Sequence, residues 1–104
     1  MTSSRQTALI TGAGNGIGRA IAIAMAENDR NVVCADIDLS AAETTAATIR
    51  QLGVKATALK VDVGETAEIS NMIQDIERQF GRLDILVNNA GVTRAADIME
   101  LTEA

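Results

Sequence analysis

The sequence predicts an α/β fold in which helices cover both faces of a parallel sheet. Short apolar runs alternate with longer stretches of helical periodicity, the pattern of consecutive β-α-β units. The strand-like runs are mostly apolar rather than alternating, as expected for strands buried on both faces. The segment TGAGNGIG, residues 11–18, places four glycines between the first strand-like run and the first helix-like stretch. Such a cluster indicates special backbone geometry or the close approach of another group.

The first half of the pattern contains two strands and one helix before position 38. Residues 7–12 form an apolar run that ends at a glycine, and residues 31–37 form a β-branched run. Between them we expect a helix over residues 17–28, ended by Asn28. Its apolar residues recur at helical spacing, at Ile17, Ile21, Ala24 and Met25.

The second half continues the alternation with two helices and two strands. A helix over residues 39–53 carries an apolar face made of Ala42, Ala46 and Ile49. Residues 55–63 are expected to form the third strand and residues 83–91 the fourth. The helix over residues 65–81 has the clearest periodicity, at Ile69, Met72, Ile73, Ile76 and Phe80. Glycines at positions 53 and 81 are expected to end the two helices.

These elements predict one partial domain over residues 1–104, a doubly wound parallel sheet truncated after its fourth strand. The expected strand order is 3-2-1-4, with the first two helices on one face and the third on the other. Residues 85–89 would then form an exposed apolar edge, so we expect self-association or a homo-oligomer. Residues 97–104 resemble the beginning of another helix, with Thr102 as its N-cap.

Composition excludes several kinds of function. The net charge of −5 argues against a nucleic-acid partner, and no apolar stretch approaches the ~20 residues of a membrane span. The chain has no histidine, which excludes histidine-dependent metal sites, so no metal site is expected. The single cysteine, Cys34, fits a reducing, cytoplasmic setting, and its place in a strand predicts a small core hydrophobe.

The glycine segment has the composition of a phosphate-binding turn. Backbone N–H groups and the dipole at a helix start attract anions. A P-loop is excluded because no Lys-Ser or Lys-Thr follows the glycines. The G-x-G-x-x-G pattern also fails, because Ile17 or Ile21 occupies the place of its last glycine. The pattern that fits is T-G-x-x-x-G-x-G, which begins at Thr11.

Polar residues also end the three later strands. Asp36 lies roughly 20 residues beyond the loop, where a carboxylate can bind the adenosine ribose of a dinucleotide. Asp62 ends the third strand and residues 88–91, NNAG, end the fourth. Ligands of open α/β sheets bind at these carboxyl ends. Each residue also has a purely structural alternative: a solvated strand end for Asp36, a helix start for Asp62, and satisfaction of backbone groups for the asparagines.

Together these motifs resemble the short-chain dehydrogenase/reductase family over roughly residues 6–104. Residues 88–104 are similar to the ketoacyl-carrier-protein reductase and polyol dehydrogenase branches. The resemblance implies a Rossmann-type domain and hydride transfer between a nicotinamide cofactor and an alcohol or ketone. The cofactor-binding residues that it implies are Gly12, Asn15, Gly16, Ile17, Gly18, Asp36, Ile37, Asp62, Val63, Asn89, Ala90 and Gly91.

The same resemblance favours NAD over NADP. Asp36 would repel a 2′-phosphate, and the sequence suggests no basic residue close enough to compensate. Asn15 and Ile37 stand where NADP-preferring relatives often carry a basic residue.

The catalytic Y-x-x-x-K motif of the family is missing from this chain. The chain contains no tyrosine, and its only lysines, Lys55 and Lys60, lie around the third strand. We therefore expect no catalytic residues here: the chain would be the cofactor-binding half, inactive alone, with substrate bound only when the other half is present. Two alternatives stay open, a non-catalytic assembly scaffold and a nucleotide-dependent methyltransferase.

Overall fold

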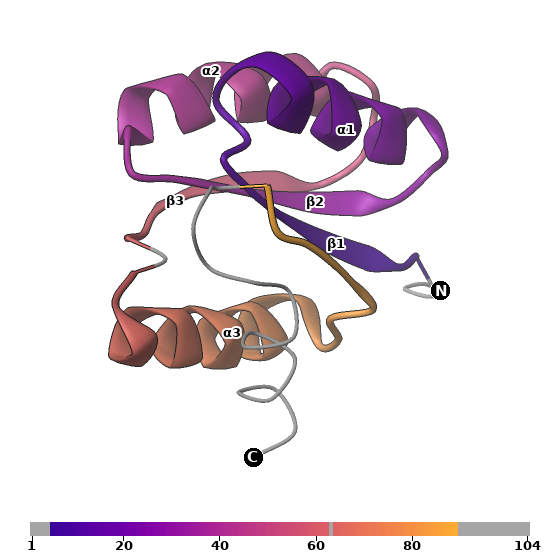
Figure 1. Cartoon of the computed structure of the whole chain (residues 1–104). Coiled ribbons are helices and arrows are strands. Elements are labelled where there is room, and N and C mark those ends of the chain that lie inside the picture. Colours follow the sequence, from indigo (N-terminus) through magenta and orange to yellow (C-terminus); the bar gives the residue numbers. More distant parts are fainter. Residues whose placement is uncertain (1–4, 63, 90–104) are drawn as a thin grey trace.

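The computed structural model describes residues 5–62 and 64–89, which form a sheet between two helical layers (Figure 1). Helices α1 and α2 cover one face of the sheet and α3 covers the other. This arrangement confirms the expected distribution of the helices. The elements are β1 (Thr7–Thr11), α1 (Gly16–Glu27), β2 (Asn31–Asp36), α2 (Leu39–Arg50), β3 (Ala56–Lys60), α3 (Thr66–Phe80) and β4 (Ile85–Val87).

The four strands are parallel and lie in the order β3-β2-β1-β4, as the sequence predicts. The central strand β1 pairs Thr7 with Asn31 of β2 and Ala8 with Ile85 of β4. Its five residues are all buried. Because β1 is flanked on both sides, the turn that follows it lies near the middle of the sheet's carboxyl edge.

The third and fourth strands are shorter than the sequence predicts. Strand β3 stops at Lys60, opposite the last residue of β2, and Val61 N–H makes one further bond to the Asp36 carbonyl. Beyond this point β2 offers no backbone partner, so the expected strand over residues 55–63 cannot continue. Strand β4 has three residues and lies within the expected range of 83–91, whose end the sequence predicts to be a polar turn. The expected helix start at Thr102 lies outside the described residues.

The two faces of the sheet are packed by side chains of different size. The core beneath α1 and α2 is rich in alanine, whereas α3 packs its face of the sheet with isoleucine and methionine. Small side chains allow the first two helices to approach the sheet closely. The buried faces expected for α2 and α3 are confirmed, at Ala42, Ala46 and Ile49 and at Ile69, Met72, Ile73 and Ile76.

The contact face of α1 differs from the stripe of larger residues in its sequence. The buried positions are Gly18, Ala22 and Ala26, whereas Ala24 is exposed and Ile17 is 71% exposed. Steric fit explains the difference: the helix that follows the glycine turn lies so close to the sheet that only small residues fit between them. Larger side chains pack at the flanks of this contact, among them Ile21 and Met25.

The helix ends agree closely with the expected ones. Asn28 is the C-cap of α1, and its side-chain amide donates to the Ala24 carbonyl at 2.8 Å. Gly81 caps α3 in the left-handed conformation, with φ of 80°. Helix α2 ends at Arg50, slightly before the expected glycine at position 53.

No helix in residues 5–62 and 64–89 combines the length and apolar character needed to cross a bilayer.

Candidate nucleotide-binding site

The glycine turn is built from close contacts as much as from unusual dihedral angles. Gly12 and Gly16 adopt positive φ values, 65° and 55°, which favour glycine. Gly18 has no such need, but a Cβ there would collide with the Gly12 carbonyl oxygen and lie 2.6 Å from Nδ2 of Asn89. The first turn of α1 therefore fits against the preceding loop only when position 18 carries no side chain.

The amino end of α1 is left without acceptors from its own side chains. Asn15 is the N-cap in an extended conformation, yet its side chain makes no capping hydrogen bond, and the first turn contains no acidic residue. The first N–H groups of a helix have no partner within the helix. Helix α2 contrasts with this, because Asp38 accepts a hydrogen bond from Ala41 N–H at 3.2 Å. The α1 terminus is therefore free to donate to an anion.

Asp36 lies beside this turn and contacts it directly. Oδ2 of Asp36 accepts from Gly14 N–H at 2.9 Å, and Oδ1 accepts from Asp38 N–H at 3.0 Å. A carboxylate can accept about four hydrogen bonds, so roughly two acceptor positions remain for a ligand. The sequence prediction that Asp36 and the glycine loop form one site is consistent with this geometry. The partner residue Gly14 was missed, although it is one of the four glycines of the segment.

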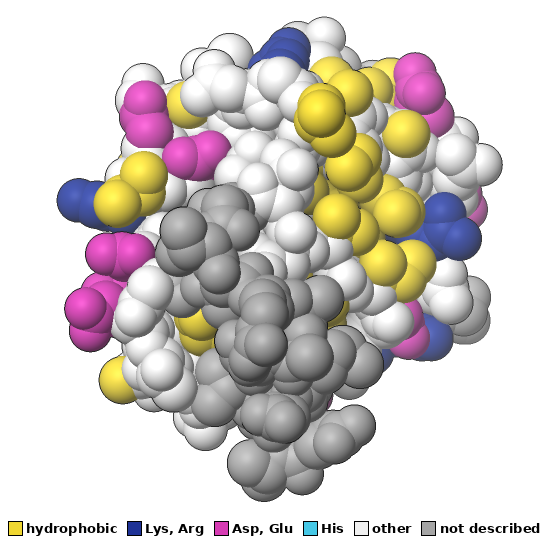
Figure 2. All heavy atoms as spheres, in the orientation of Figure 1, with side chains coloured by type: hydrophobic (Ala, Val, Ile, Leu, Met, Phe, Trp, Pro, Cys, Tyr) yellow, Lys and Arg dark blue, Asp and Glu magenta, His cyan; other side chains and the backbone are white. Residues whose placement is uncertain are grey.

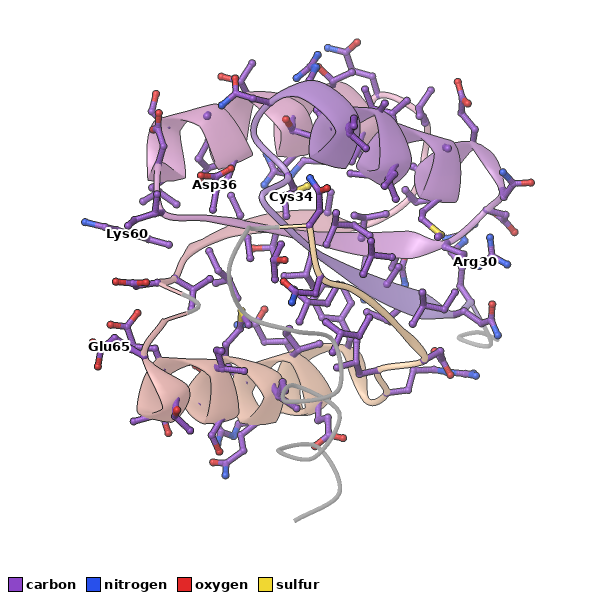
Figure 3. The ribbon with its side chains drawn as sticks, in the orientation of Figure 1. Arg30, Cys34, Asp36, Lys60 and Glu65 are labelled. Carbon is purple, nitrogen blue, oxygen red and sulfur yellow. The ribbon has the colours of Figure 1, made fainter. Side chains whose placement is uncertain are left out.

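A basic residue lies nearer to Asp36 than the sequence suggests. Lys60 is the register partner of Asp36 on β3, so the expectation that no basic residue is close needs correction. The sequence could not reveal this, because the two positions are brought together only by strand pairing. Figure 3 shows the exposed Lys60 side chain extending outward at the sheet edge.

The end of β4 is joined to the end of β1 through Thr11. The Thr11 hydroxyl accepts from Asn89 N–H at 2.9 Å and lies 3.0 Å from Oδ1 of Asn88, to which it can donate. The Asn89 side-chain amide lies against the glycine turn beside position 18. Asn88 thus has the structural role considered above, while Asn89 lies where a ligand on the turn would be within reach. Ala90 and Gly91 lie outside the described residues.

Two further contacts fix the loop to the β2–α2 unit, and neither was predicted. Ala13 N–H donates to the Ala35 carbonyl at 3.1 Å, and the buried Thr45 hydroxyl donates to the Ala13 carbonyl at 2.9 Å. Arg19 in turn donates to the Thr45 hydroxyl at 3.1 Å. A threonine within the alanine-rich face of the second helix is the sequence signal that could have indicated this contact.

The two isoleucines of the predicted site are exposed. Ile17 is 71% exposed and Ile37 is 62% exposed, the highest values for large apolar side chains in the described residues. Both flank the carboxyl edge, one beside the glycine turn and the other next to Asp36. Exposed aliphatic surface at this place suits a partly apolar ligand, such as a nucleotide base.

Asp62 participates in closing the third β–α turn. Its Oδ1 accepts from Gly64 N–H at 2.9 Å, and its own N–H donates to Glu68 at 2.9 Å. These bonds favour the structural interpretation of Asp62. Val63, predicted to contact adenine, lies outside the described residues.

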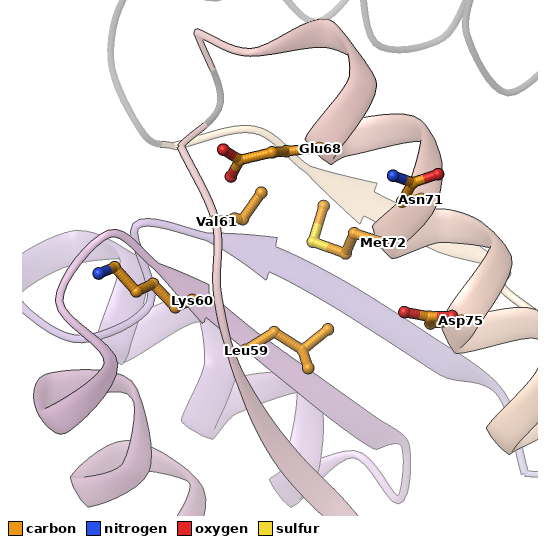
Figure 4. A pocket seen from close by; sticks show the side chains of 7 residues that line it. All are labelled: Leu59, Lys60, Val61, Glu68, Asn71, Met72 and Asp75. Atoms are coloured by element: carbon orange, nitrogen blue, oxygen red, sulfur yellow. The ribbon is translucent and has the colours of Figure 1, made fainter.

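A separate hollow of about 210 Å³ lies between β3 and α3 (Figure 4). Its lining includes Leu59, Met72, Lys60, Glu68 and Asp75, and because two carboxylates outnumber the single lysine the hollow is unfavourable for a diphosphate. None of the predicted site residues lines it.

Cys34 is unsuited to redox chemistry. It is fully buried, and burial raises the pKa of its thiol to about 12, which keeps it protonated at neutral pH. Within residues 5–62 and 64–89, no group of His, Cys, Asp or Glu side chains could hold a metal ion.

The parallel sheet in the order β3-β2-β1-β4, with helices on both faces, is a Rossmann-type fold, and open α/β folds of this kind bind ligands at the carboxyl edge. The family model of short chain dehydrogenases matches residues 6–104. The chain therefore belongs to the short-chain dehydrogenase family, whose members bind nicotinamide cofactors. This assignment favours the dehydrogenase interpretation over the methyltransferase alternative.

Individual relatives agree with the family. Galactitol 2-dehydrogenase of Agrobacterium fabrum is 43% identical over 103 residues, which cover 99% of this chain and 39% of that protein. The 3-oxoacyl-[acyl-carrier-protein] reductase of Staphylococcus aureus is 40% identical over 94% of this chain and 40% of that protein. The chain thus spans about two fifths of the length of these relatives.

A solved structure of NAD⁺-bound xylitol dehydrogenase superposes with a TM-score of 0.80 at 34% identity. The match covers 84% of this chain and 34% of that one.

Proposed function

We propose that residues 1–104 form the cofactor-binding part of an NAD-dependent oxidoreductase that acts on an alcohol or ketone. The observation that carries the proposal is the uncapped amino end of α1, which lies beside Gly12 and follows Gly14, the loop residue whose N–H donates to Asp36. Amide donors would hold the diphosphate, and the carboxylate would accept from the adenosine ribose.

The remaining site residues would surround the same ligand. Ile17 and Ile37 would cover the cofactor with apolar surface, and Asn89 would donate to it from the end of β4. Asn15, Gly16, Ala90 and Gly91 would contribute backbone near the phosphates and ribose, while Asp62 and Val63 would lie toward the adenine. The bound cofactor supplies the hydride, whereas this chain's residues bind and orient it.

NAD is proposed as the preferred cofactor because Asp36 carries a negative charge and two free acceptor positions. A free 2′-hydroxyl can donate to that carboxylate, whereas a 2′-phosphate would be repelled at short range. Lys60 offsets part of the repulsion, but its side chain extends outward at the sheet edge and is exposed.

Calorimetric titration with NAD, NADP and ADP-ribose tests this proposal. We expect NAD and ADP-ribose to bind, and NADP to bind more weakly. Asp36→Ala should reduce the preference for NAD more than any other single change in the described site, by tenfold or more, because charge repulsion and ribose hydrogen bonds are lost together. Tighter binding of NADP would contradict the cofactor assignment, and no binding of any of the three would favour the assembly scaffold instead.

Turnover is proposed to require a tyrosine and a lysine that residues 1–104 do not provide. A protein limited to these residues should bind NAD weakly and catalyse no oxidation. The free, buried thiol of Cys34 suits a reducing compartment such as the cytoplasm.

The β4 edge is proposed to support self-association. Among the described strands β4 pairs only with β1, and Figure 2 shows hydrophobic side chains gathered over α1 and β4. Ile21, Met25, Ile85 and Val87 are partly exposed there. An open strand edge beside apolar side chains favours pairing with another chain. A monodisperse monomer in sedimentation at high protein concentration would contradict this part of the proposal.

A further inference from the structure

The Asp36 carboxylate is held in place by the glycine loop as well as by its own strand. Gly14 N–H donates to Oδ2 and Asp38 N–H donates to Oδ1, so one hydrogen bond fixes each oxygen. Two bonds to different segments define the plane of the carboxylate. The acceptor positions left over therefore point in fixed directions.

Position 14 also has no space for a side chain. A Cβ on Gly14 would lie 2.5 Å from the Ala41 Cβ, 2.9 Å from Oδ2 of Asp36 and 3.1 Å from the Ala41 carbonyl carbon. Any side chain here would displace the first turn of α2, the carboxylate, or both. This requirement is steric, because no positive φ is recorded at position 14, unlike Gly12 and Gly16.

The loop itself cannot easily move to relieve such a clash. The preceding residue, Ala13, is bound at both ends of its backbone: its N–H to the Ala35 carbonyl and its carbonyl to the Thr45 hydroxyl. Ala13 and Thr45 are completely buried. The Asp36 side chain, which is partly exposed, would therefore yield, together with the first turn of α2.

We infer that Gly14 is a positioning residue for cofactor choice, whose amide and missing side chain hold the Asp36 carboxylate where it favours a ribose 2′-hydroxyl over a 2′-phosphate. The inference rests on the proposed function. It assigns part of the preference for NAD over NADP to a residue that need not touch the 2′-hydroxyl or the 2′-phosphate. Because Gly14 acts through Asp36, its effect on cofactor choice is measured as the ratio of two affinities, separately from any loss of stability caused by the contact with Ala41.

The test is Gly14→Ala in the full-length protein, with NAD and NADP dissociation constants measured by calorimetry. We expect the NADP-to-NAD ratio of dissociation constants to fall about tenfold, the size associated with one lost hydrogen bond to a charged group, with most of the change in NAD binding. Gly53→Ala is the matched control: its φ of 93° makes an alanine strained, yet its Cβ would meet no atom within 4 Å. That variant should lose stability and keep the wild-type ratio.

A second variant separates packing from positioning. Gly14→Ala combined with Ala41→Gly removes the 2.5 Å contact to α2 but leaves the 2.9 Å contact to the carboxylate. The 3.1 Å contact to the Ala41 carbonyl carbon also remains, so we expect this double variant to recover part of the thermal stability while the ratio stays reduced. Recovery of the wild-type ratio together with stability would overturn the inference, as would an unchanged ratio in folded Gly14→Ala.

One measurement needs no variant at all. In the wild-type protein the Gly14 amide proton should remain protected from exchange when NAD binds, because the carboxylate keeps this bond while it accepts from the ribose. Loss of that protection on binding would overturn the inference even if every variant failed to fold. If the wild-type protein binds neither dinucleotide, the proposed function fails and the inference with it. A wild-type preference for NAD that Gly14→Ala leaves unchanged removes only the inference.

Discussion

The first and third β–α turns occupy equivalent places in the fold and are used in opposite ways. After β1, the helix begins without a side-chain cap or an acidic residue in its first turn. After β3, the backbone donors are bound by the turn's own groups: Asp62 N–H to Glu68, Gly64 N–H to Asp62, and Glu65 N–H to the Asp62 carbonyl. Helix α3 also begins without a side-chain capping bond, so the two turns differ in the acidic residues near them and in the turn donors that these residues bind, not in topology.

Electrostatics and position reinforce the contrast. Three carboxylates, those of Asp62, Glu65 and Glu68, surround the third turn, at the edge strand β3. The first turn follows the central strand and contains none. Between them, the second turn supplies Asp36 and the capping Asp38. Under the proposed function, a dinucleotide would meet donors at the centre of the carboxyl edge and an acceptor one strand away.

The largest effect should come from adding one methyl group to the first turn. Gly18→Ala would place a Cβ against the Gly12 carbonyl, a backbone group that cannot rotate away. We expect a loss of about 1–3 kcal/mol in the free energy of unfolding, from overpacking, and NAD binding below detection. Urea unfolding and calorimetry measure the two effects.

The matched change in the third turn, Gly64→Ala, should have little effect on stability or on NAD affinity. In Gly64→Ala the nearest atom to the new Cβ is Oδ1 of Asp62, at 3.2 Å, the end of an exposed side chain. Equal losses of NAD affinity in both variants would contradict the distinction between the turns.

A smaller effect is expected from making the first turn resemble the third. Asn15→Asp would add a negative charge at the amino end of α1, where it can cap the helix. We expect a gain of about 0.3–1 kcal/mol in stability from the helix dipole, together with NAD binding weakened about tenfold by repulsion of the diphosphate. The midpoint of thermal unfolding should therefore rise, while the NAD affinity measured by calorimetry falls.

Thr66→Asp is the control, since it adds the same charge at the first residue of α3. It should leave NAD affinity within about twofold, because the third turn is already acidic and closed. If Asn15→Asp bound NAD as tightly as the wild type, the first turn would not be the diphosphate site.

The smallest effect on stability is expected at a carboxylate that forms hydrogen bonds within the fold and has no proposed role in ligand binding. Asp84, at the amino edge of the sheet, pairs with Arg82 at 2.7 and 2.8 Å and accepts from Thr7 N–H at 2.9 Å. The Arg82 hydrogen bond, followed by that of Thr7, lowers the pKa of Asp84 below its ordinary value. A lowered pKa in the folded state stabilises the protein above the unfolded pKa, near 4, and this stabilisation is lost as pH falls through the folded value.

Asp84→Asn should therefore cost stability at pH 7 and progressively less at acidic pH, below the unfolded pKa. The loss should be below about 1 kcal/mol, since the ion pair is close to the surface. Urea unfolding across this pH range measures it, and NAD affinity should not change. A loss that was equal at pH 7 and at acidic pH would show that the carboxylate charge is not the cause.

The overall fold could be predicted from the sequence because each helix and strand has a local signal. The apolar periodicity around Ile73 and the glycine at position 81 define α3 without reference to the rest of the chain. The contact face of α1 could not be predicted in this way. It depends on how closely the helix meets the sheet, which selects Gly18 over the larger Ile17.

The residues of the candidate site can be separated in the same way, into those with a local sequence signal and those without one. Asp36 and the glycines have recognisable spacing, so they were found from the sequence. Gly14, Thr45 and Lys60 were missed because their roles arise from contacts across strands and helices. Thr45 is the clearest case: it lies 32 residues from the Ala13 carbonyl that it binds, with β2 between them.

The most direct test of the central claim is a map of amide chemical-shift changes during titration with NAD. Donation by the first turn of α1 predicts the largest changes at Gly16, Ile17 and Gly18, with almost none at Gly53 and Gly81. Changes centred instead on the hollow lined by Leu59 and Asp75, or no changes at millimolar NAD, would contradict the account.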